Sequence, residues 1–247
     1  SSVYTTICGP AQYVAERALT DLIAPEDGTI GTGKGVAGCV VAMNVKDGSI
    51  AVLANFPTFS PANFVGGISQ SIWDMYNTSE SQYPLLNRAI AGTYPAASTM
   101  KAFSGLAGLK YGFATEESTW ECGGSWDGFN SGDVQKCWLR TGHGTETFHQ
   151  SIVDSCDITF YEIAKDFWDA GRAGKISETA LQDEIKRYHF GSTSGIDITG
   201  EAAGRIPTPE WKKEFFKDTP EEASWRGGDM TNMAIGQGYV LVTPLQI

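Results

Sequence analysis

Two stretches in the first quarter of the chain carry the apolar, β-branched pattern of β-strands. They span residues 36–44 and 49–55, and Lys46-Asp47-Gly48 between them is typical of a turn. Together they predict a β-hairpin. Residues 3–7 form a shorter β-like run. Residues 9–22 place apolar side chains at helical spacing after a glycine–proline start, which predicts a helix packed on its apolar face.

Later in the chain the apolar positions follow helical spacing, bounded by capping residues and glycines. The predicted helical segments cover residues 98–110, 147–157, 158–168, 177–190 and 211–216. The stretches that we expect to be irregular are 57–83, 120–144 and 195–209. Strands concentrated early and helices in the middle predict an α+β fold, or an α/β fold with a helical lobe.

Composition narrows the class of protein. The 247 residues are 41% hydrophobic, which is enough to build a sizeable core and argues against global disorder. A formal net charge of −11 argues against nucleic acid as a partner, because nucleic-acid-binding modules need a basic face. Residues 28–35 are rich in glycine but lack the pattern of a phosphate-binding loop, so we expect a linker there.

One short motif carries candidate chemistry. Tyr94-Pro95-Ala96-Ala97 leads into a helix-forming run, which places Ser98 at a helix N-terminus and Lys101 one turn further on the same face. Serine becomes a nucleophile when a neighbour takes its proton, and a desolvated lysine can do so. An isolated Ser-x-x-Lys also fits a capping serine beside a solvated lysine, so the other motifs must decide.

A second group of residues has the donors of a metal site. Cys122, Cys137, His143 and Cys156 offer three thiolates and an imidazole, the donor set of tetrahedral Zn²⁺. Their spacing is not that of a zinc finger. A Cys122–Cys137 disulfide and simple buried thiols are the alternatives.

The order of the motifs resembles the penicillin-binding transpeptidases. The predicted hairpin is followed by Tyr94-Pro95-x-x-Ser98-x-x-Lys101, then by Ser155-x-Asp157, then by Ile235-Gly236-Gln237-Gly238. Within this family the chain is most similar to the elongation-type monofunctional class, penicillin-binding protein 2. The details that favour this class are Asp157, the loop at 65–69 and Gly142-His143-Gly144.

The resemblance implies a fold and a role for each site residue. The fold would be the α/β sandwich of serine β-lactamases and transpeptidases, an antiparallel sheet flanked by helices with a helical lobe. Ser98 would attack the penultimate D-Ala carbonyl of a peptidoglycan stem peptide, and Lys101 would activate it. Ser155 would relay a proton to the leaving amine, and Asp157 would hold Lys101 and a substrate amide. β-Lactams would trap Ser98 as a stable ester.

Further expectations follow from the same resemblance. Gly236, Gln237 and Gly238 would bind substrate, although Gly236 and Gly238 also fit turn or close-packing glycines. The four-residue Cys/His group matches ligand positions of zinc-containing relatives, which implies a structural Zn²⁺. Cell-wall synthesis partners and an extracytoplasmic location, with an N-terminal membrane helix absent from this sequence, are also implied.

Two departures from the family pattern stand out. Pro95-Ala96-Ala97 replaces the Pro-Pro-Gly that is frequent before the nucleophile, and no Lys-Thr-Gly or Lys-Ser-Gly triplet occurs. Arg140-Thr141-Gly142 precedes Ser155 and therefore cannot serve as that third motif. We expect residues 1–247 to be one transpeptidase domain cut before the third motif, with an incomplete sheet. A non-catalytic scaffold of the same fold and a serine β-lactamase are the alternative functions.

Overall fold

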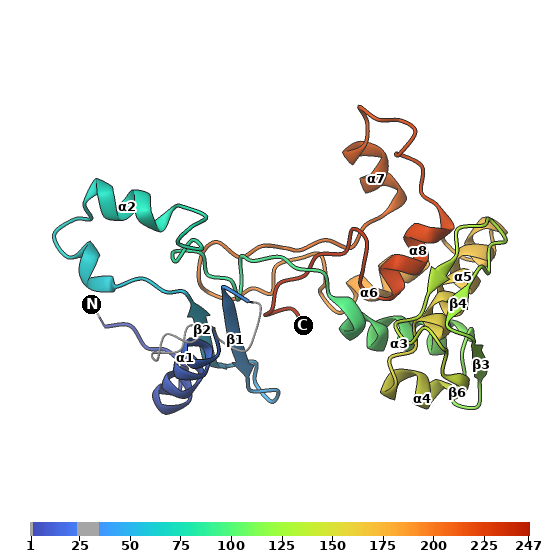
Figure 1. Ribbon diagram of the computed structural model, residues 1–247, viewed down its shortest axis with the longest axis horizontal. Coiled ribbons are helices and arrows are strands. Elements are labelled where there is room, and N and C mark those ends of the chain that lie inside the picture. The colour runs from blue at the N-terminus through green and yellow to red at the C-terminus, as the bar shows by residue number, and fades with distance from the viewer. Residues whose placement is uncertain (1, 24–34) are drawn as a thin grey trace. The chain divides into compact units, whose positions relative to one another are not determined.

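The computed structural model describes residues 2–23 and 35–247, and the chain forms two compact units (Figure 1). The first unit comprises Ser1–Thr93, Ile196–Ala202 and Thr243–Leu245, and the second comprises Tyr94–Gly195, Ala203–Val242 and Gln246–Ile247. The expected glycine-rich linker at 28–35 lies outside the described residues except for Gly35.

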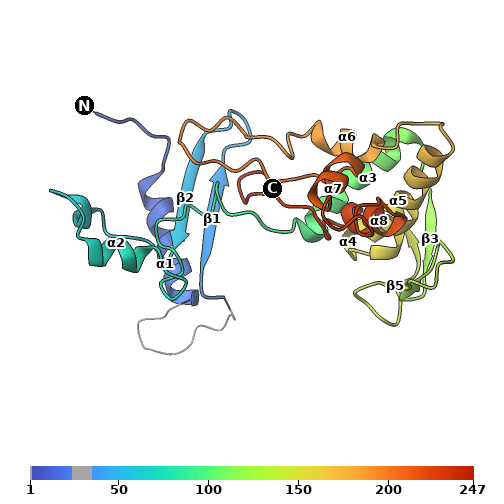
Figure 2. The same ribbon diagram turned by 90° about the horizontal axis from the view of Figure 1, so that it is seen from above.

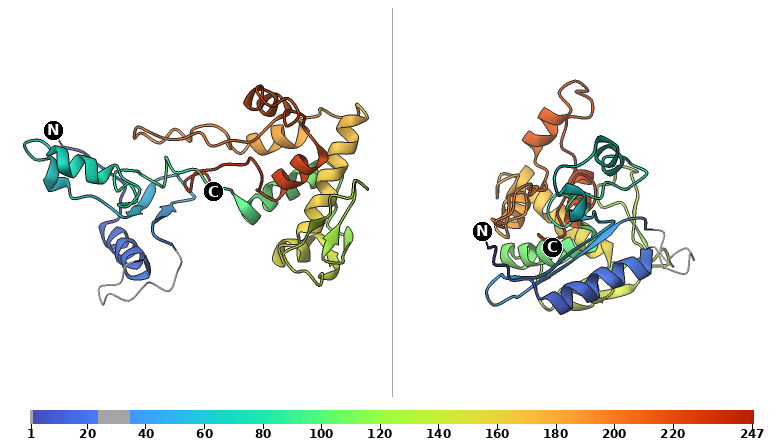
Figure 3. Two further views of the ribbon diagram at one scale, coloured as in Figure 1. Left: turned by 45° about the horizontal axis from the view of Figure 1, so that its top comes forward. Right: turned by 90° about the vertical axis from the view of Figure 1, so that its left-hand side faces the viewer.

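The first unit is built on the predicted hairpin. Strands β1 (Gly38–Met43) and β2 (Ile50–Phe56) pair antiparallel, with Cys39 opposite Asn55 and Val41 opposite Leu53. Helix α1 (Gly9–Ile23) lies along one face of the hairpin (Figure 3), where Leu19 packs against Val52 and Ala54. The hairpin and the helix are therefore confirmed. Because side chains alternate along a strand, Val41 and Leu53 pack on the other face, against Ala89, Ile90 and Leu245.

Two local predictions for this unit are wrong. Residues 3–7 form no strand: Thr6 Oγ1 donates to Ile50 O, the backbone bond to β2 comes from Cys8 N–H to Ala51 O, and Val3 and Tyr4 stay exposed. Residues 57–83 are not simply irregular, because they contain the 3₁₀ helix η1 (Pro61–Phe64) and α2 (Gln70–Tyr76). Ser69 caps α2 and accepts a hydrogen bond from Ile72 N–H.

The second unit is mainly helical. Its helices are η2 (Ala97–Met100), α3 (Lys101–Tyr111), α4 (Phe148–Val153), α5 (Asp157–Arg172), α6 (Ala180–Lys186), α7 (Pro209–Phe215) and α8 (Gly227–Ala234). Helices α3, α5 and α8 gather around one core (Figure 2), in which Phe160, Ile163 and Phe167 of α5 are fully buried. The long amphipathic α5 therefore organises this unit.

Short strand pairs replace the irregular stretch expected at 120–144. Strand β3 (Thr119–Cys122) pairs antiparallel with β6 (Gly144–Thr147), and β4 (Ser125–Trp126) pairs with β5 (Gln135–Lys136). Each sheet in the described part of the chain is two-stranded and antiparallel. The fold class is α+β, as predicted.

Candidate functional site

Ser98 lies in a tight turn that leads directly into α3. It is exposed within η2, and Lys101 begins α3 one turn later. Ala97 has a φ of +51°, a left-handed conformation that costs a residue with a side chain about 1–2 kcal/mol. Glycine adopts this conformation freely, so the structure explains why Gly is frequent at this point of the family pattern. The backbone turn that presents Ser98 is therefore held by its surroundings.

Gly236 supports this turn from the end of α8. Ala97 N–H donates to Gly236 O at 2.9 Å, and Gly236 itself has a φ of +69°. A Cβ atom at Gly236 would lie 2.2 Å from Ala97 O, which no side chain tolerates. Close packing is thus the visible role of Gly236. Gln237 and Gly238 are exposed beside it, and their contact with substrate stays a prediction.

Lys101 carries the buried amine of the site, with only 2% of its surface exposed. Its Nζ donates to Asp157 Oδ1 at 2.6 Å, to Ser155 O at 2.7 Å and to Ser155 Oγ at 3.0 Å. The structure therefore brings Lys101, Ser155 and Asp157 together as the sequence predicts. A buried amine bonded to a hydroxyl is the kind of group that can move a proton to and from a nearby serine, and Ser98 lies one helical turn before Lys101.

The loop that carries Ser155 is also constrained. Ser155 has a φ of +54°, a second left-handed residue with a side chain. Cys156 after it is buried and is the N-cap residue of α5, and Asp157 opens the first turn of that helix. An acidic side chain there is favoured by the helix dipole. The start of α5 thus fixes both Ser155 and Asp157 against Lys101.

Sequence reasoning did not find Trp138, which contacts this loop. Its backbone N–H donates to Asp157 Oδ2 at 2.8 Å, and its indole Nε1–H donates to Asp154 O at 2.9 Å. A backbone donor leaves no signal in a sequence. The only available hint was its position directly after Cys137.

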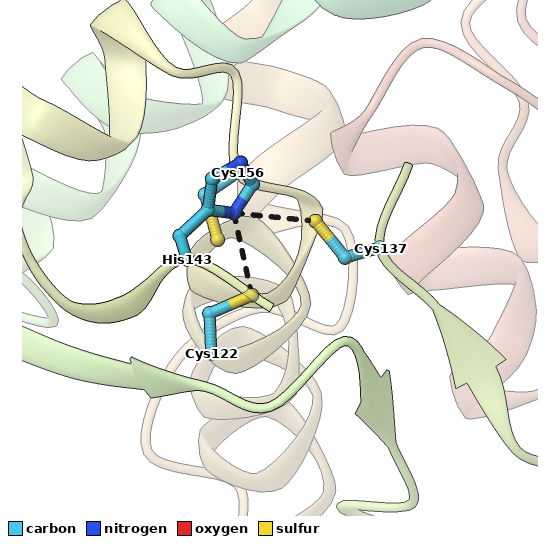
Figure 4. A group of neighbouring side chains, drawn as sticks. All are labelled: Cys122, Cys137, His143 and Cys156. Atoms are coloured by element: carbon cyan, nitrogen blue, oxygen red, sulfur yellow. Dashed lines mark hydrogen bonds between the residues drawn. The ribbon is translucent and has the colours of Figure 1, made fainter. Parts of the chain in front are cut away.

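The candidate metal ligands converge from four parts of the second unit. Cys122 ends β3, Cys137 follows β5, His143 precedes β6 and Cys156 precedes α5 (Figure 4). One donor atom from each residue lies within 4.8 Å of all the others. His143 Nδ1 is 3.4 Å from Cys122 Sγ and 3.6 Å from Cys137 Sγ. The corresponding S···N separation around tetrahedral Zn²⁺ is about 3.5 Å, so the donors fit this ion.

Burial opposes the ionisation of two of the three thiols, Cys137 and Cys156. Burial raises the pKa of Cys156 to about 12, and burial also raises the pKa of Cys137. Cys122 is buried too, but hydrogen bonds with backbone groups of His143 and Gly124 lower its pKa. A bound cation reverses this balance, because a coordinating thiol is deprotonated. All three thiols are free cysteines, so the Cys122–Cys137 disulfide is not formed in the structure.

A comparison with protein families matches most of the chain. The model of the family described as "Penicillin binding protein transpeptidase domain" matches residues 38–247. Among curated proteins, the peptidoglycan D,D-transpeptidase MrdA of Haemophilus influenzae is 33% identical over 246 residues, which is 100% of this chain and 33% of the relative. The chain therefore spans about a third of the length of the curated relatives it matches.

Solved structures of penicillin-binding protein 2 also match the chain. Penicillin-binding protein 2 of Pseudomonas aeruginosa, in complex with WCK 5153, superposes with a TM-score of 0.79 at 29% identity. That match covers 98% of this chain and 48% of the other. The complex of penicillin-binding protein 2 and MreC from Helicobacter pylori gives a TM-score of 0.72 at 31% identity, covering 85% and 36%.

Proposed function

Because the chain belongs to the penicillin-binding protein transpeptidase family, we propose that it is the catalytic part of a peptidoglycan D,D-transpeptidase for cell-wall elongation. The observation that carries this proposal is the buried Lys101 amine, bonded to Ser155 Oγ and Asp157, one helical turn beyond the exposed Ser98. Relatives that cover the chain bear the same activity in their names. The substrate would be a stem peptide that ends in D-Ala-D-Ala.

The residues divide the reaction into two acyl transfers. Lys101 Nζ, acting as a neutral amine, takes the proton of Ser98 Oγ, and that oxygen bonds to the penultimate D-Ala carbonyl carbon. The C–N bond to the terminal D-Ala then breaks, and the departing amine receives a proton through Ser155 Oγ. An acceptor amine from a neighbouring strand next attacks the ester carbonyl carbon and forms the amide cross-link. The C–O bond to Ser98 breaks, and Oγ takes back the proton that the amine loses. The backbone N–H of Ser98 would stabilise the oxyanion formed in each transfer.

The Cys/His group is proposed to hold a structural Zn²⁺. Cys122, Cys137, His143 and Cys156 would be its ligands, and with four protein donors the ion has no open position for substrate. When bound, Zn²⁺ would supply folding free energy to a segment with only short strands. Cys156 lies between Ser155 and Asp157, so the same ligand set would fix the loop that carries both.

Partners and location follow from the same family. The Helicobacter pylori relative was solved with MreC, and we extend to this protein an assembly with membrane-associated cell-wall synthesis proteins on the extracytoplasmic side. Within residues 2–23 and 35–247, no helix combines the length and the apolar character needed to cross a bilayer.

The test uses the full-length protein that carries this sequence. Incubated with a D-Ala-D-Ala stem peptide and an acceptor amine, it should release one D-Ala for each cross-link formed, and Ser98→Ala should do neither. Cross-linking without Ser98, or no release of D-Ala by the wild type, would contradict the transpeptidase assignment. A fluorescent penicillin separates the alternatives, because a β-lactamase would turn it over rapidly and a scaffold would not react.

A further inference from the structure

Trp138 has a large apolar side chain, but it is not part of the hydrophobic cores that the described residues form. The residue is 59% exposed, yet its backbone and its side chain both make hydrogen bonds. Its ring also packs edge-on against His143, with centroids 5.4 Å apart and planes at 61°. An exposed tryptophan held at three points is positioned by its contacts rather than by burial.

The first contact completes the surroundings of the Asp157 carboxylate. Oδ1 accepts from Lys101 Nζ at 2.6 Å, while Oδ2 accepts from Trp138 N–H at 2.8 Å. Each oxygen therefore has its own donor from a different segment. Two donors fix both the plane of the carboxylate and its distance from Lys101. A single hydrogen bond would leave the carboxylate free to rotate.

The second contact holds the backbone just before Ser155. The indole Nε1–H of Trp138 donates to Asp154 O at 2.9 Å, and Lys101 Nζ donates to Ser155 O at 2.7 Å. These two carbonyls belong to the peptide groups before and after the Cα of Ser155, whose φ is +54°. A left-handed residue with a side chain persists only when its surroundings hold it. The two bonds are such a restraint, one on each side of the residue.

We propose that Trp138 is a positioning residue that keeps Ser155 and Asp157 in their reactive arrangement against Lys101. This inference rests on the proposed acyl-serine function of the site. It assigns to Trp138 no contact with the reacting atoms. Its indole restrains the loop at Asp154, its backbone N–H orients the carboxylate of Asp157, and its ring ties both to the segment that carries Cys137 and His143.

The test compares wild type, Trp138→Phe and Trp126→Phe in the full-length protein. Trp138→Phe keeps an aromatic ring and the backbone N–H but loses the indole donor to Asp154. Trp126→Phe is the control, because it also loses an indole hydrogen bond, from Nε1 to Glu162 Oε1 at 2.6 Å, and that bond involves neither Asp154 nor Asp157. Penicillin acylation is resolved into the dissociation constant of the first complex and the acylation rate constant.

Loss of one neutral hydrogen bond predicts that Trp138→Phe acylates about three- to tenfold more slowly, with the dissociation constant changed less than about twofold. Trp126→Phe should keep both constants even if its melting temperature falls. A weaker first complex with an unchanged rate constant would overturn the proposal and make Trp138 a ligand contact. Unchanged values for both constants would overturn it as well.

Amide hydrogen exchange separates this proposal from the proposed function. Exchange across residues 152–157 should accelerate in Trp138→Phe and not in Trp126→Phe, without any ligand present. If wild type fails to react with penicillin, the proposed function fails while exchange still tests the restraint. If exchange in 152–157 is the same in wild type and Trp138→Phe, the positioning role is wrong.

Discussion

Lys101 and Asp157 form a buried ion pair with 2.6 Å between Nζ and Oδ1, although 56 positions separate them in the chain. The pair joins the first residue of α3 to the first residue of α5. Both helices also pack in the same hydrophobic core, so the core and the ion pair position the site together.

Removing the carboxylate should cost stability as well as activity. Asp157→Ala leaves Lys101 buried without its counter-charge, and breaking a buried pair in this way costs about 3 kcal/mol or more. Urea denaturation measures the loss. The matched control is Asp169→Ala, which breaks the exposed Lys165–Asp169 pair and should cost less than about 1 kcal/mol. Equal losses for the two variants would contradict the structural role of the buried pair.

A methyl group at Gly236 should disturb the turn that carries Ser98. The added Cβ of Gly236→Ala would lie 2.2 Å from Ala97 O, so the turn or α8 must shift. We expect a loss of about 1–3 kcal/mol in the free energy of unfolding, together with slower acylation of Ser98. Gly228→Ala, where an added Cβ meets nothing within 4 Å, is the control and should leave both quantities unchanged. Normal acylation by Gly236→Ala would show that the packing at Gly236 does not position Ser98.

Removal of the proposed metal should destabilise the second unit. Protein purified without added metal should contain about one zinc per chain. Chelation should lower the melting temperature by about 5 °C or more, the shift expected for a loss of about 2 kcal/mol in a chain of this size. Cys156→Ser should lose the zinc, whereas the exposed Cys8→Ser should keep it. Metal-free protein of unchanged stability, or a Cys122–Cys137 disulfide, would refute the zinc proposal.

Glu146 should make stability depend on pH. It is 3% exposed, its Oε2 has no hydrogen-bond partner in the described residues, and burial followed by the nearby Asp154 carboxylate raises its pKa. The native state therefore holds this proton more tightly than the unfolded chain does. Stability is lost as pH rises through the folded pKa and the buried carboxyl ionises.

Glu146→Gln removes that ionisation and should stabilise the protein only at higher pH. The gain in melting temperature over wild type should be small near about pH 4, where free glutamate is half protonated, and should grow toward about pH 8. The exposed Glu116→Gln is the control and should show no such trend. A gain that stays constant across this range would show that ionisation of Glu146 is not the cause.

Local patterns predicted the elements whose signals are strong in the sequence. The β1–β2 hairpin follows from its two β-rich runs and turn, and α3 ends as expected at Gly112, which has a φ of +74°. Helix α8 was missed because it begins with two glycines, which are poor helix formers, and is stabilised by burial of Met230 and Met233. Tertiary packing stabilises this helix, and no local sequence pattern predicts it.

The site was predictable only in its side-chain chemistry. Ser98, Lys101, Ser155 and Asp157 could be assigned through motif order, and the structure places the last three within hydrogen-bonding distance. The left-handed backbone at Ala97 and Ser155 could not be predicted, because alanine and serine disfavour it and only the folded surroundings impose it. The contact of Trp138 with Asp157 was hidden for a similar reason, since it uses a backbone N–H.

The most direct test of the account is where a penicillin attaches. Full-length protein is incubated with benzylpenicillin, and the adduct is located by peptide mass spectrometry. The account predicts one adduct per chain, on Ser98, that is abolished in Ser98→Ala and formed much more slowly in Lys101→Ala. An adduct on another residue, or unchanged labelling of Ser98→Ala, would contradict the assignment of Ser98 as the nucleophile.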